Sequence, residues 1–481
     1  MSCELGRREL LQVACGGAVC MGLAGGLIAA DAPAGLRLIS PGCRRSKVRV
    51  GKLYLVGTNN MWPTPKLDIE AERQRYENEF ARMKKEFADV EFVGNGIVKT
   101  AEDIGKLADS LKNADGILVI HLTMGALPTL HEILKLGRPT MVFAAPYSGH
   151  EWTAFGGLRR QKEGALLDCL LTADMNELAA AVRPFRAIHH LREAKVLNVT
   201  ARTEWLEFAN KVKEKFGTQI KQIDRDRMIR AYEAVPEPEA QAEAQRWMSA
   251  AQKVVEPSKD EIVRSCRLAL AFEKLLNEEE ATVITVDCYG TMYHQLPAFP
   301  CIGNVRLNDL GLGGICESDL EAAMTHILFQ GLSGRPSFIS DPTMDVSTNA
   351  IILAHCLGST KMDGPEGPAA PYRLRTIMER QEGAVPQVFM RVGQRVTQGR
   401  LVGTDMFIYF TGQVIEAPDL DRGCRTKITV KVDGDAERLW QDWAHGLHRS
   451  TCYGDWAKDL QRFAKFAGIR LVNEVEKPAQ A

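Results

Sequence analysis

Three apolar runs decide the fold of this chain: Thr282-Val283-Ile284-Thr285-Val286, Pro336-Ser337-Phe338-Ile339-Ser340 and Ala350-Ile351-Ile352-Leu353-Ala354. Each run is short and rich in β-branched or large apolar residues, which is typical of a buried strand. We expect all three to be parallel strands of one α/β domain, because helical patterns occupy the chain before the first run and between the first and the second.

Polar side chains follow these runs. Asp287, Asp341 and His355 come directly after the three predicted strands, and Glu317 lies in the Gly-rich connection after the first. Open α/β sheets bind their ligands just beyond the carboxyl ends of parallel strands. A set rich in carboxylate oxygen, with one or two imidazoles, favours Mn²⁺, Co²⁺ or Mg²⁺ over a thiolate zinc site. The pattern therefore predicts a divalent metal beside proton-transfer chemistry.

Each of these residues also has a purely structural interpretation. Glu317 precedes a predicted helix at 320–330, where a carboxylate complements the helix dipole. Asp341 suits a turn, and His355 suits a hydrogen-bonded core histidine. His448 could lie on the surface, since its H-x-x-H spacing is weak evidence for a metal. The functional interpretation is favoured because several polar groups gather at strand ends of one predicted domain.

The chain is long enough for two or three domains at 481 residues. Alternating strand and helix patterns predict a doubly wound α/β domain at 47–193 and a second one at 194–360. Beyond a linker rich in Gly, Pro and Ala, the period changes to two, which predicts a small antiparallel β-barrel or sandwich with closing helices at 371–475. A formal net charge of −1 argues against a nucleic-acid partner, which requires a basic surface.

Two helix starts are predicted from capping signals. Thr100 with Asp103, and Ser258 with Glu261, have the spacing of a capping box, in which the cap and the third helical residue exchange hydrogen bonds.

The first residues resemble an export signal. Arg7 and Arg8 precede a stretch without charge from Val13 to Ala30, an order that resembles a twin-arginine signal in residues 1–34. We therefore expect the twin-arginine export machinery to carry the folded protein to the periplasm. A short membrane anchor or a weakly ordered tail is the alternative, and a protein without a signal would be cytoplasmic.

Cysteine spacing indicates neither a zinc knuckle nor a disulfide framework. Three of the 12 cysteines lie in the predicted signal, and the nine that remain are scattered without any C-x-x-C pair. We expect most of them to be small buried apolar residues.

The chain resembles the L-fucose isomerase and L-arabinose isomerase family. The resemblance rests on short motifs around the predicted site and near the C-terminus. They are Asp287-Cys288, Leu307-Asn308-Asp309 with Gly311, Cys316-Glu317-Ser318-Asp319, Phe338-Ile339-Ser340-Asp341, Ala354-His355-Cys356, Gly446-Leu447-His448, Tyr453-Gly454-Asp455, Leu460 and Gly468-Ile469. The resemblance is firm over about 281–356 and 445–470. Over 47–200 it extends only to the architecture.

The resemblance implies an aldose–ketose isomerase with a Mn²⁺-type ion and an ene-diolate intermediate. Glu317 and Asp341 match the family's two metal-binding carboxylates, which also relay protons. His448 matches its late metal-binding histidine, and His355 matches a histidine of the arabinose branch. Removing the proton next to a carbonyl creates negative charge on oxygen, which a divalent ion stabilises.

The resemblance also implies a homo-oligomer, trimeric or hexameric, in which the first domain of one subunit helps to close the site of its neighbour. Trp62, His150 and Trp152 follow predicted strands of that domain, so they are candidate sugar-binding residues, although they could be ordinary loop residues. Two alternatives remain open: an exported sugar-binding protein on the same fold, and a metal-dependent sugar lyase or epimerase.

Overall fold

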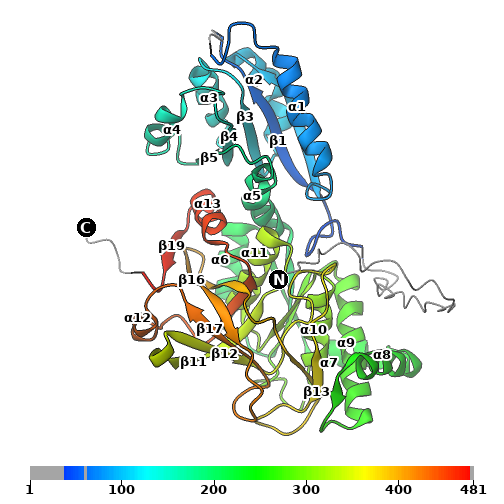
Figure 1. Cartoon of the computed structure of the whole chain (residues 1–481). Coiled ribbons are helices and arrows are strands. Elements are labelled where there is room, and N and C mark those ends of the chain that lie inside the picture. The colour runs from blue at the N-terminus through cyan, green and yellow to red at the C-terminus, as the bar shows by residue number, and fades with distance from the viewer. Residues whose placement is uncertain (1–36, 59–61, 477–481) are drawn as a thin grey trace, which may run out of the picture. The chain divides into compact units, whose positions relative to one another are not determined.

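The computed structural model describes residues 37–58 and 62–476 (Figure 1). The predicted signal with Arg7 and Arg8 lies outside these residues. Among the described residues, no helix combines the length and the apolar character that crossing a membrane requires.

The N-terminal part is a doubly wound α/β sheet, as predicted. Its five parallel strands run in the order β2-β1-β3-β4-β5, and helices connect them along the chain (Figure 1). The elements are β1 (Val48–Leu55), α1 (Ile69–Arg82), β2 (Val90–Val98), α2 (Ala101–Leu111), β3 (Gly116–His121), α3 (Leu127–Leu134), β4 (Thr140–Ala144), α4 (Trp152–Leu158), β5 (Leu167–Leu171) and α5 (Glu177–Glu193). The strand order reverses between β1 and β3, the point at which such sheets usually bind ligands.

A second parallel sheet has four strands in the order β10-β9-β6-β7. Its elements are β6 (Lys195–Val199), α6 (Leu206–Phe216), β7 (Gln219–Ile223), α7 (Arg225–Glu233), α8 (Glu237–Ala250), α9 (Lys259–Glu278), β9 (Val283–Val286), α10 (Cys301–Asp309), β10 (Gly313–Cys316) and α11 (Leu320–Ser333). A small sheet beside it joins β8 (Lys253–Val254), β13 (Tyr372–Arg375) and β14 (Val385–Val388).

The C-terminal part is a closed antiparallel barrel of six strands. They pair around the ring in the order β15-β18-β11-β12-β17-β16, β16 pairs back to β15, and β19 adds to β16 in parallel. The elements are β11 (Phe338–Asp345), the short 3₁₀ helix Val346–Thr348, β12 (Ala350–His355), β15 (Arg395–Val402), β16 (Met406–Glu416), β17 (Thr426–Val432), α12 (Ala436–Gln441), β18 (Arg449–Tyr453), α13 (Ala457–Ala467) and β19 (Arg470–Asn473). The predicted fold class, two α/β parts followed by a β-barrel, is confirmed.

One part of the prediction is wrong. The runs around Phe338 and Ala350 are not parallel strands of the second sheet, because β11 and β12 form an antiparallel hairpin within the barrel. A parallel pair needs a crossover of a dozen or more residues, and the four residues between β11 and β12 are too few. Consequently Asp341 lies inside β11 rather than beyond its end, and His355 is the last residue of β12. The limits of the three predicted domains stay predictions.

Both predicted capping boxes are present. Thr100 with Asp103 caps α2, and Ser258 with Glu261 caps α9, each with the reciprocal pair of hydrogen bonds. The long helix α9 packs its apolar face against the second sheet, where Cys266, Ala269 and Phe272 are fully buried.

The Gly-rich connection after β9 forms strand β10, which sequence reasoning missed. Gly314 lies against helix α10, because a Cβ there would come within 2.3 Å of the Cα of Asn304. The side-chain amide of Asn308 pairs with the free edge of β10: it accepts from Gly314 N at 2.7 Å and donates to Gly314 O at 3.2 Å. The glycines thus let α10 close tightly over the strand that leads into Glu317.

Candidate metal centre

Four side chains from three parts of the chain converge at one end of the barrel. Glu317 follows β10, Asp341 lies in β11, His355 ends β12, and His448 directly precedes β18. Oxygen or nitrogen atoms of Glu317, His355 and His448 all lie within 4.8 Å of one another. Asp341 adjoins them, since its Oδ1 is 3.3 Å from His448 Nε2.

Strand register explains why residues so distant in sequence meet here. Strand β11 pairs with β18 so that Ser340 lies opposite Arg449, which places Asp341 next to His448. On its other side β11 pairs with β12, with Asp341 opposite Ala354, the neighbour of His355. Asp341 therefore lies between the two histidines at the barrel end.

Glu317 reaches the same point through an unusual backbone turn. Glu317 and Ser318 both have left-handed backbone angles, with φ of 61° and 57°. For residues other than glycine such a conformation costs about 1–3 kcal/mol each, and it is found mainly where function or surrounding structure requires it. Ser318 Oγ donates to Asn198 Oδ1 at 2.5 Å, which ties the turn to β6.

The two histidines present free nitrogens to the carboxylates. His355 Nε2 lies 3.6 Å from Glu317 Oε1, and His448 Nε2 lies 3.7 Å from Glu317 Oε2. Both His448 Nε2 and Asp341 Oδ1 are buried without a hydrogen-bond partner among the described residues. Two buried polar atoms that face each other unsatisfied are costly, and a shared cation would satisfy both.

Sequence reasoning missed the residues that orient His448. Asp319, the N-cap of α11, accepts a hydrogen bond from His448 Nδ1 at 3.0 Å, which directs Nε2 into the cluster. Arg400 of β15 binds the same carboxylate at 2.8 Å, binds Glu321 at 2.7 Å and donates to the carbonyl of His448. The Glu317-Ser318-Asp319 motif contained the signal, but nothing in it indicated that Asp319 contacts His448.

Burial and neighbouring charges shift the pKa values of the cluster in opposite directions. Burial raises the pKa of Glu317, but His355 and His448 more than offset this and hold it below its ordinary value. Burial dominates at Asp341 and raises its pKa. Burial lowers the pKa of His448, yet the bond to Asp319 outweighs it and the pKa lies above its ordinary value. The two carboxylates therefore lie in different electrostatic environments although they share the same imidazole.

Asp287, the remaining polar residue after a predicted strand, has a structural role in the described part of the chain. Its carboxylate accepts hydrogen bonds from Thr200 Oγ1 and from the amide and hydroxyl of Thr291, and it pairs with Arg202 at 3.0 Å. These contacts fix the loop that follows β9.

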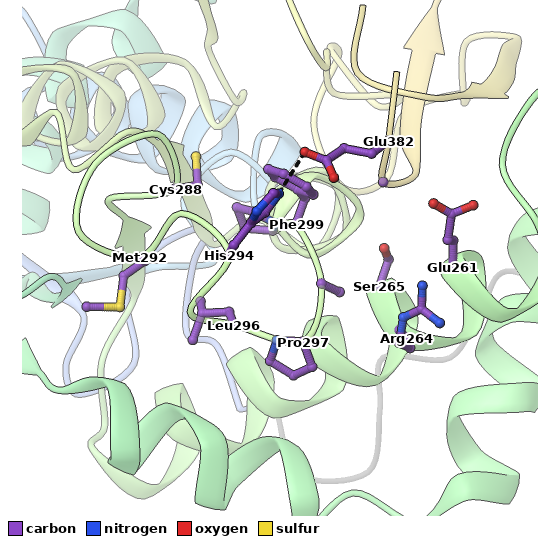
Figure 2. Close-up of a pocket in the computed structure, with 13 residues that line it drawn as sticks. Glu261, Arg264, Ser265, Cys288, Met292, His294, Leu296, Pro297, Phe299 and Glu382 are labelled. Atoms are coloured by element: carbon purple, nitrogen blue, oxygen red, sulfur yellow. Dashed lines mark hydrogen bonds and ion pairs between the residues drawn. The ribbon is translucent and has the colours of Figure 1, made fainter. Parts of the chain in front are cut away.

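A cavity adjoins the cluster through Cys288. Its volume is about 150 Å³, and Figure 2 shows Met292, His294, Phe299 and Glu382 around it, with Glu382 bound to His294 at 2.9 Å. Burial and the neighbouring carboxylate of Glu317 raise the pKa of Cys288 to about 12. Cys288 thus lines the pocket and also lies near Glu317.

The predicted sugar-binding residues lie in loops at the carboxyl ends of the first sheet. Trp62 and His150 meet there, with ring centroids 4.5 Å apart, while Trp152 begins α4 and is 52% exposed. Glu151, between His150 and Trp152 in the chain, has a structural role, since it accepts hydrogen bonds from the amides of Gly125 and Ala126 at 2.8 Å. None of the contacts found in the described residues joins Trp62, His150 or Trp152 to the metal cluster, and their role stays a prediction.

Replacing Asp319 tests how His448 is held. In Asp319→Asn the cap of α11 remains, but the acceptor for His448 Nδ1–H is weakened, so we expect the Kd for Mn²⁺ to rise about 10- to 100-fold. Isothermal titration calorimetry measures this change. Glu321→Gln is the matched control, because it also removes a charge from Arg400 but does not contact His448. An equal loss of affinity in both variants would assign the effect to Arg400 instead.

No model of a known protein family matches the chain. Two curated proteins are similar to it, both with the name sulfoquinovose isomerase. One, from Alkalicoccus urumqiensis, is 22% identical over 278 residues, which cover 54% of this chain and 59% of the relative. The other, from Clostridium sp. (strain MSTE9), is 23% identical over 326 residues, covering 63% of this chain and 69% of the relative. The chain is thus a distant relative of proteins that carry the name of a sugar isomerase.

Proposed function

We propose that the protein is a metal-dependent aldose–ketose isomerase, with Glu317, Asp341, His355 and His448 as metal ligands. The observation that carries the proposal is the pair of buried atoms without hydrogen bonds, Asp341 Oδ1 and His448 Nε2, which face each other at 3.3 Å. Two carboxylates and two imidazoles suit Mn²⁺, with Co²⁺ or Mg²⁺ as alternatives. Distant similarity to proteins named sulfoquinovose isomerase supports the sugar-isomerase class.

The reaction moves a carbonyl from C1 to C2 of a sugar. The bound ion would stabilise the negative charge that develops on the two sugar oxygens. One carboxylate of the Glu317–Asp341 pair removes the proton from C2 and returns it to C1, while the other transfers the proton between the two oxygens. Their different environments allow the two roles to diverge. Asp319 and Arg400 keep His448 in place throughout.

The substrate proposal covers three aldoses. The names of the relatives make sulfoquinovose one candidate, and the sequence resemblance adds L-fucose and L-arabinose. We also propose, from the resemblance, a homo-oligomer in which Trp62, His150 and Trp152 serve a neighbouring subunit's site. Export to the periplasm remains a proposal that rests on Arg7 and Arg8.

Isotope exchange tests the reaction. The purified protein, loaded with Mn²⁺, is incubated in D₂O with each aldose, and the products are identified by NMR. We expect a ketose, with deuterium at C2 of the recovered aldose. Sugar fragments would indicate a lyase, and an epimeric aldose would indicate an epimerase. Sugar binding without any turnover would indicate a sugar-binding protein instead of an isomerase.

A further inference from the structure

A second group of potential metal ligands lies beside the first and is chemically different from it. The Sγ atoms of Cys356 and Cys424 and a carboxylate oxygen of Glu379 all lie within 4.8 Å of one another. Cys356 directly follows His355, but it takes no part in the proposed sugar chemistry. Sequence spacing did not indicate this group, because Glu379 and the two cysteines come from three separate segments.

Strand pairing brings the two thiols together. His355, the last residue of β12, lies opposite Thr426, the first residue of β17. Cys356 and Cys424 lie just beyond this last pair, on adjacent strands that leave the barrel at the same end. Cys356 is buried and Cys424 is partly exposed, so one thiol lies inside the protein and the other lies towards solvent.

A buried arginine anchors the loop that carries the carboxylate. Arg425, next to Cys424 in the chain, is only 3% exposed and donates to the carbonyl and hydroxyl oxygens of Thr376 at 2.7 and 3.2 Å. Thr376 begins the loop that carries Glu379, and the same loop carries Glu382, drawn in Figure 2. As a result Cys424 Sγ donates to Glu379 Oε1 at 3.1 Å.

We propose that Cys356, Cys424 and Glu379 bind a zinc ion, separate from the metal at Glu317, Asp341, His355 and His448. Two thiolates and a carboxylate are ligands that Zn²⁺ accepts, and water would fill the fourth position of a tetrahedral site. Binding releases the two thiol protons, so it involves no change in oxidation state. Zinc here would fix the end of β12, the strand that also supplies His355.

A hydrogen-bonded pair of thiols without an ion is the simpler explanation, and three features favour the metal. The group contains a carboxylate, which adds nothing to the packing of two small apolar side chains. The two cysteines differ in exposure, so an ion could enter from the side of Cys424. The hydroxyl of Tyr289 lies 3.9 Å from Cys356 Sγ, which adds a further polar atom to the group.

Cobalt spectroscopy separates this site from the first one. Co²⁺ bound by thiolate absorbs strongly in the near ultraviolet, whereas Co²⁺ bound by carboxylate and imidazole does not, because the band is a sulfur-to-metal charge transfer. We expect the reduced full-length protein to develop this band on Co²⁺ titration and to lose it when Zn²⁺ is added. Glu317→Gln should retain the band, since it alters only the first site.

Variants at the second site complete the test. Cys424→Ser should diminish the band, because one of the two thiolates is lost. It should also weaken zinc binding there by more than about 100-fold, beyond the effect of losing a supporting residue. Glu379→Gln should keep the band and bind zinc more weakly, and Cys169→Ser, a partly buried cysteine on β5, should behave like the wild type. A band of undiminished intensity in Cys424→Ser overturns the proposal. Absence of the band from reduced wild type, with Cys356 and Cys424 found as a disulfide before reduction, also overturns it.

Discussion

Glu317→Gln should lower kcat by about 10³-fold with every aldose that the wild-type protein converts. The change removes a negative charge and a proton acceptor while preserving almost all of the side-chain volume. A positioned acid–base group contributes about 10²–10⁴-fold to such reactions, and Glu317 is also a proposed metal ligand. Turnover is measured at saturating Mn²⁺, and deuterium exchange at C2 is followed in the same samples.

The fold should survive this substitution. Glu317 contacts His355 and His448 at 3.6 and 3.7 Å, distances too long for strong hydrogen bonds, so Gln loses little stabilisation. Circular dichroism and thermal unfolding should match the wild-type protein. Glu416→Gln, at an exposed residue of β16, provides the control for the chemical change alone. Wild-type kcat in Glu317→Gln would remove Glu317 from the reaction.

Local signals in the sequence predicted local structure well. The capping boxes at Thr100 and Ser258 depend only on residues three positions apart, and both are present. The change of period after the predicted linker correctly indicated an antiparallel barrel. Strand alternation with helices correctly indicated the parallel sheets, because this pattern reflects burial on both faces.

The pairing of strands could not be predicted in the same way. The assignment of β11 and β12 to a parallel sheet failed because an apolar run predicts a buried strand but not its neighbours. The connection length was the available signal, since it is too short for a crossover. The contact of Asp319 with His448 depends on how β18 pairs with β11, and no local pattern specifies that register.

His448→Ala should weaken Mn²⁺ binding by at least about 100-fold, more than the loss of a supporting residue would. The variant removes the only imidazole nitrogen within 3.3 Å of Asp341 among the described residues. The ion would then lose one imidazole ligand, and the carboxylates of Glu317 and Asp341 would lose the imidazole between them. Metal content after gel filtration, together with calorimetric titration, measures the loss. His131→Ala, on the exposed face of α3, is the matched control.

Comparison with His355→Ala shows whether the two histidines bind one ion. If both histidines are ligands of the same ion, the double variant should lose less binding free energy than the sum of the two single losses. The reason is that the effects of residues that share a partner are not additive. Full metal occupancy in His448→Ala would move the ligand role to His355 or to His445. The structure makes His355 the stronger of these, since it lies within the cluster, whereas His445 is exposed. Full metal occupancy in both single variants and in the double variant would show that the ion binds elsewhere. The unsatisfied atoms of Asp341 and His448 would then not mark its site.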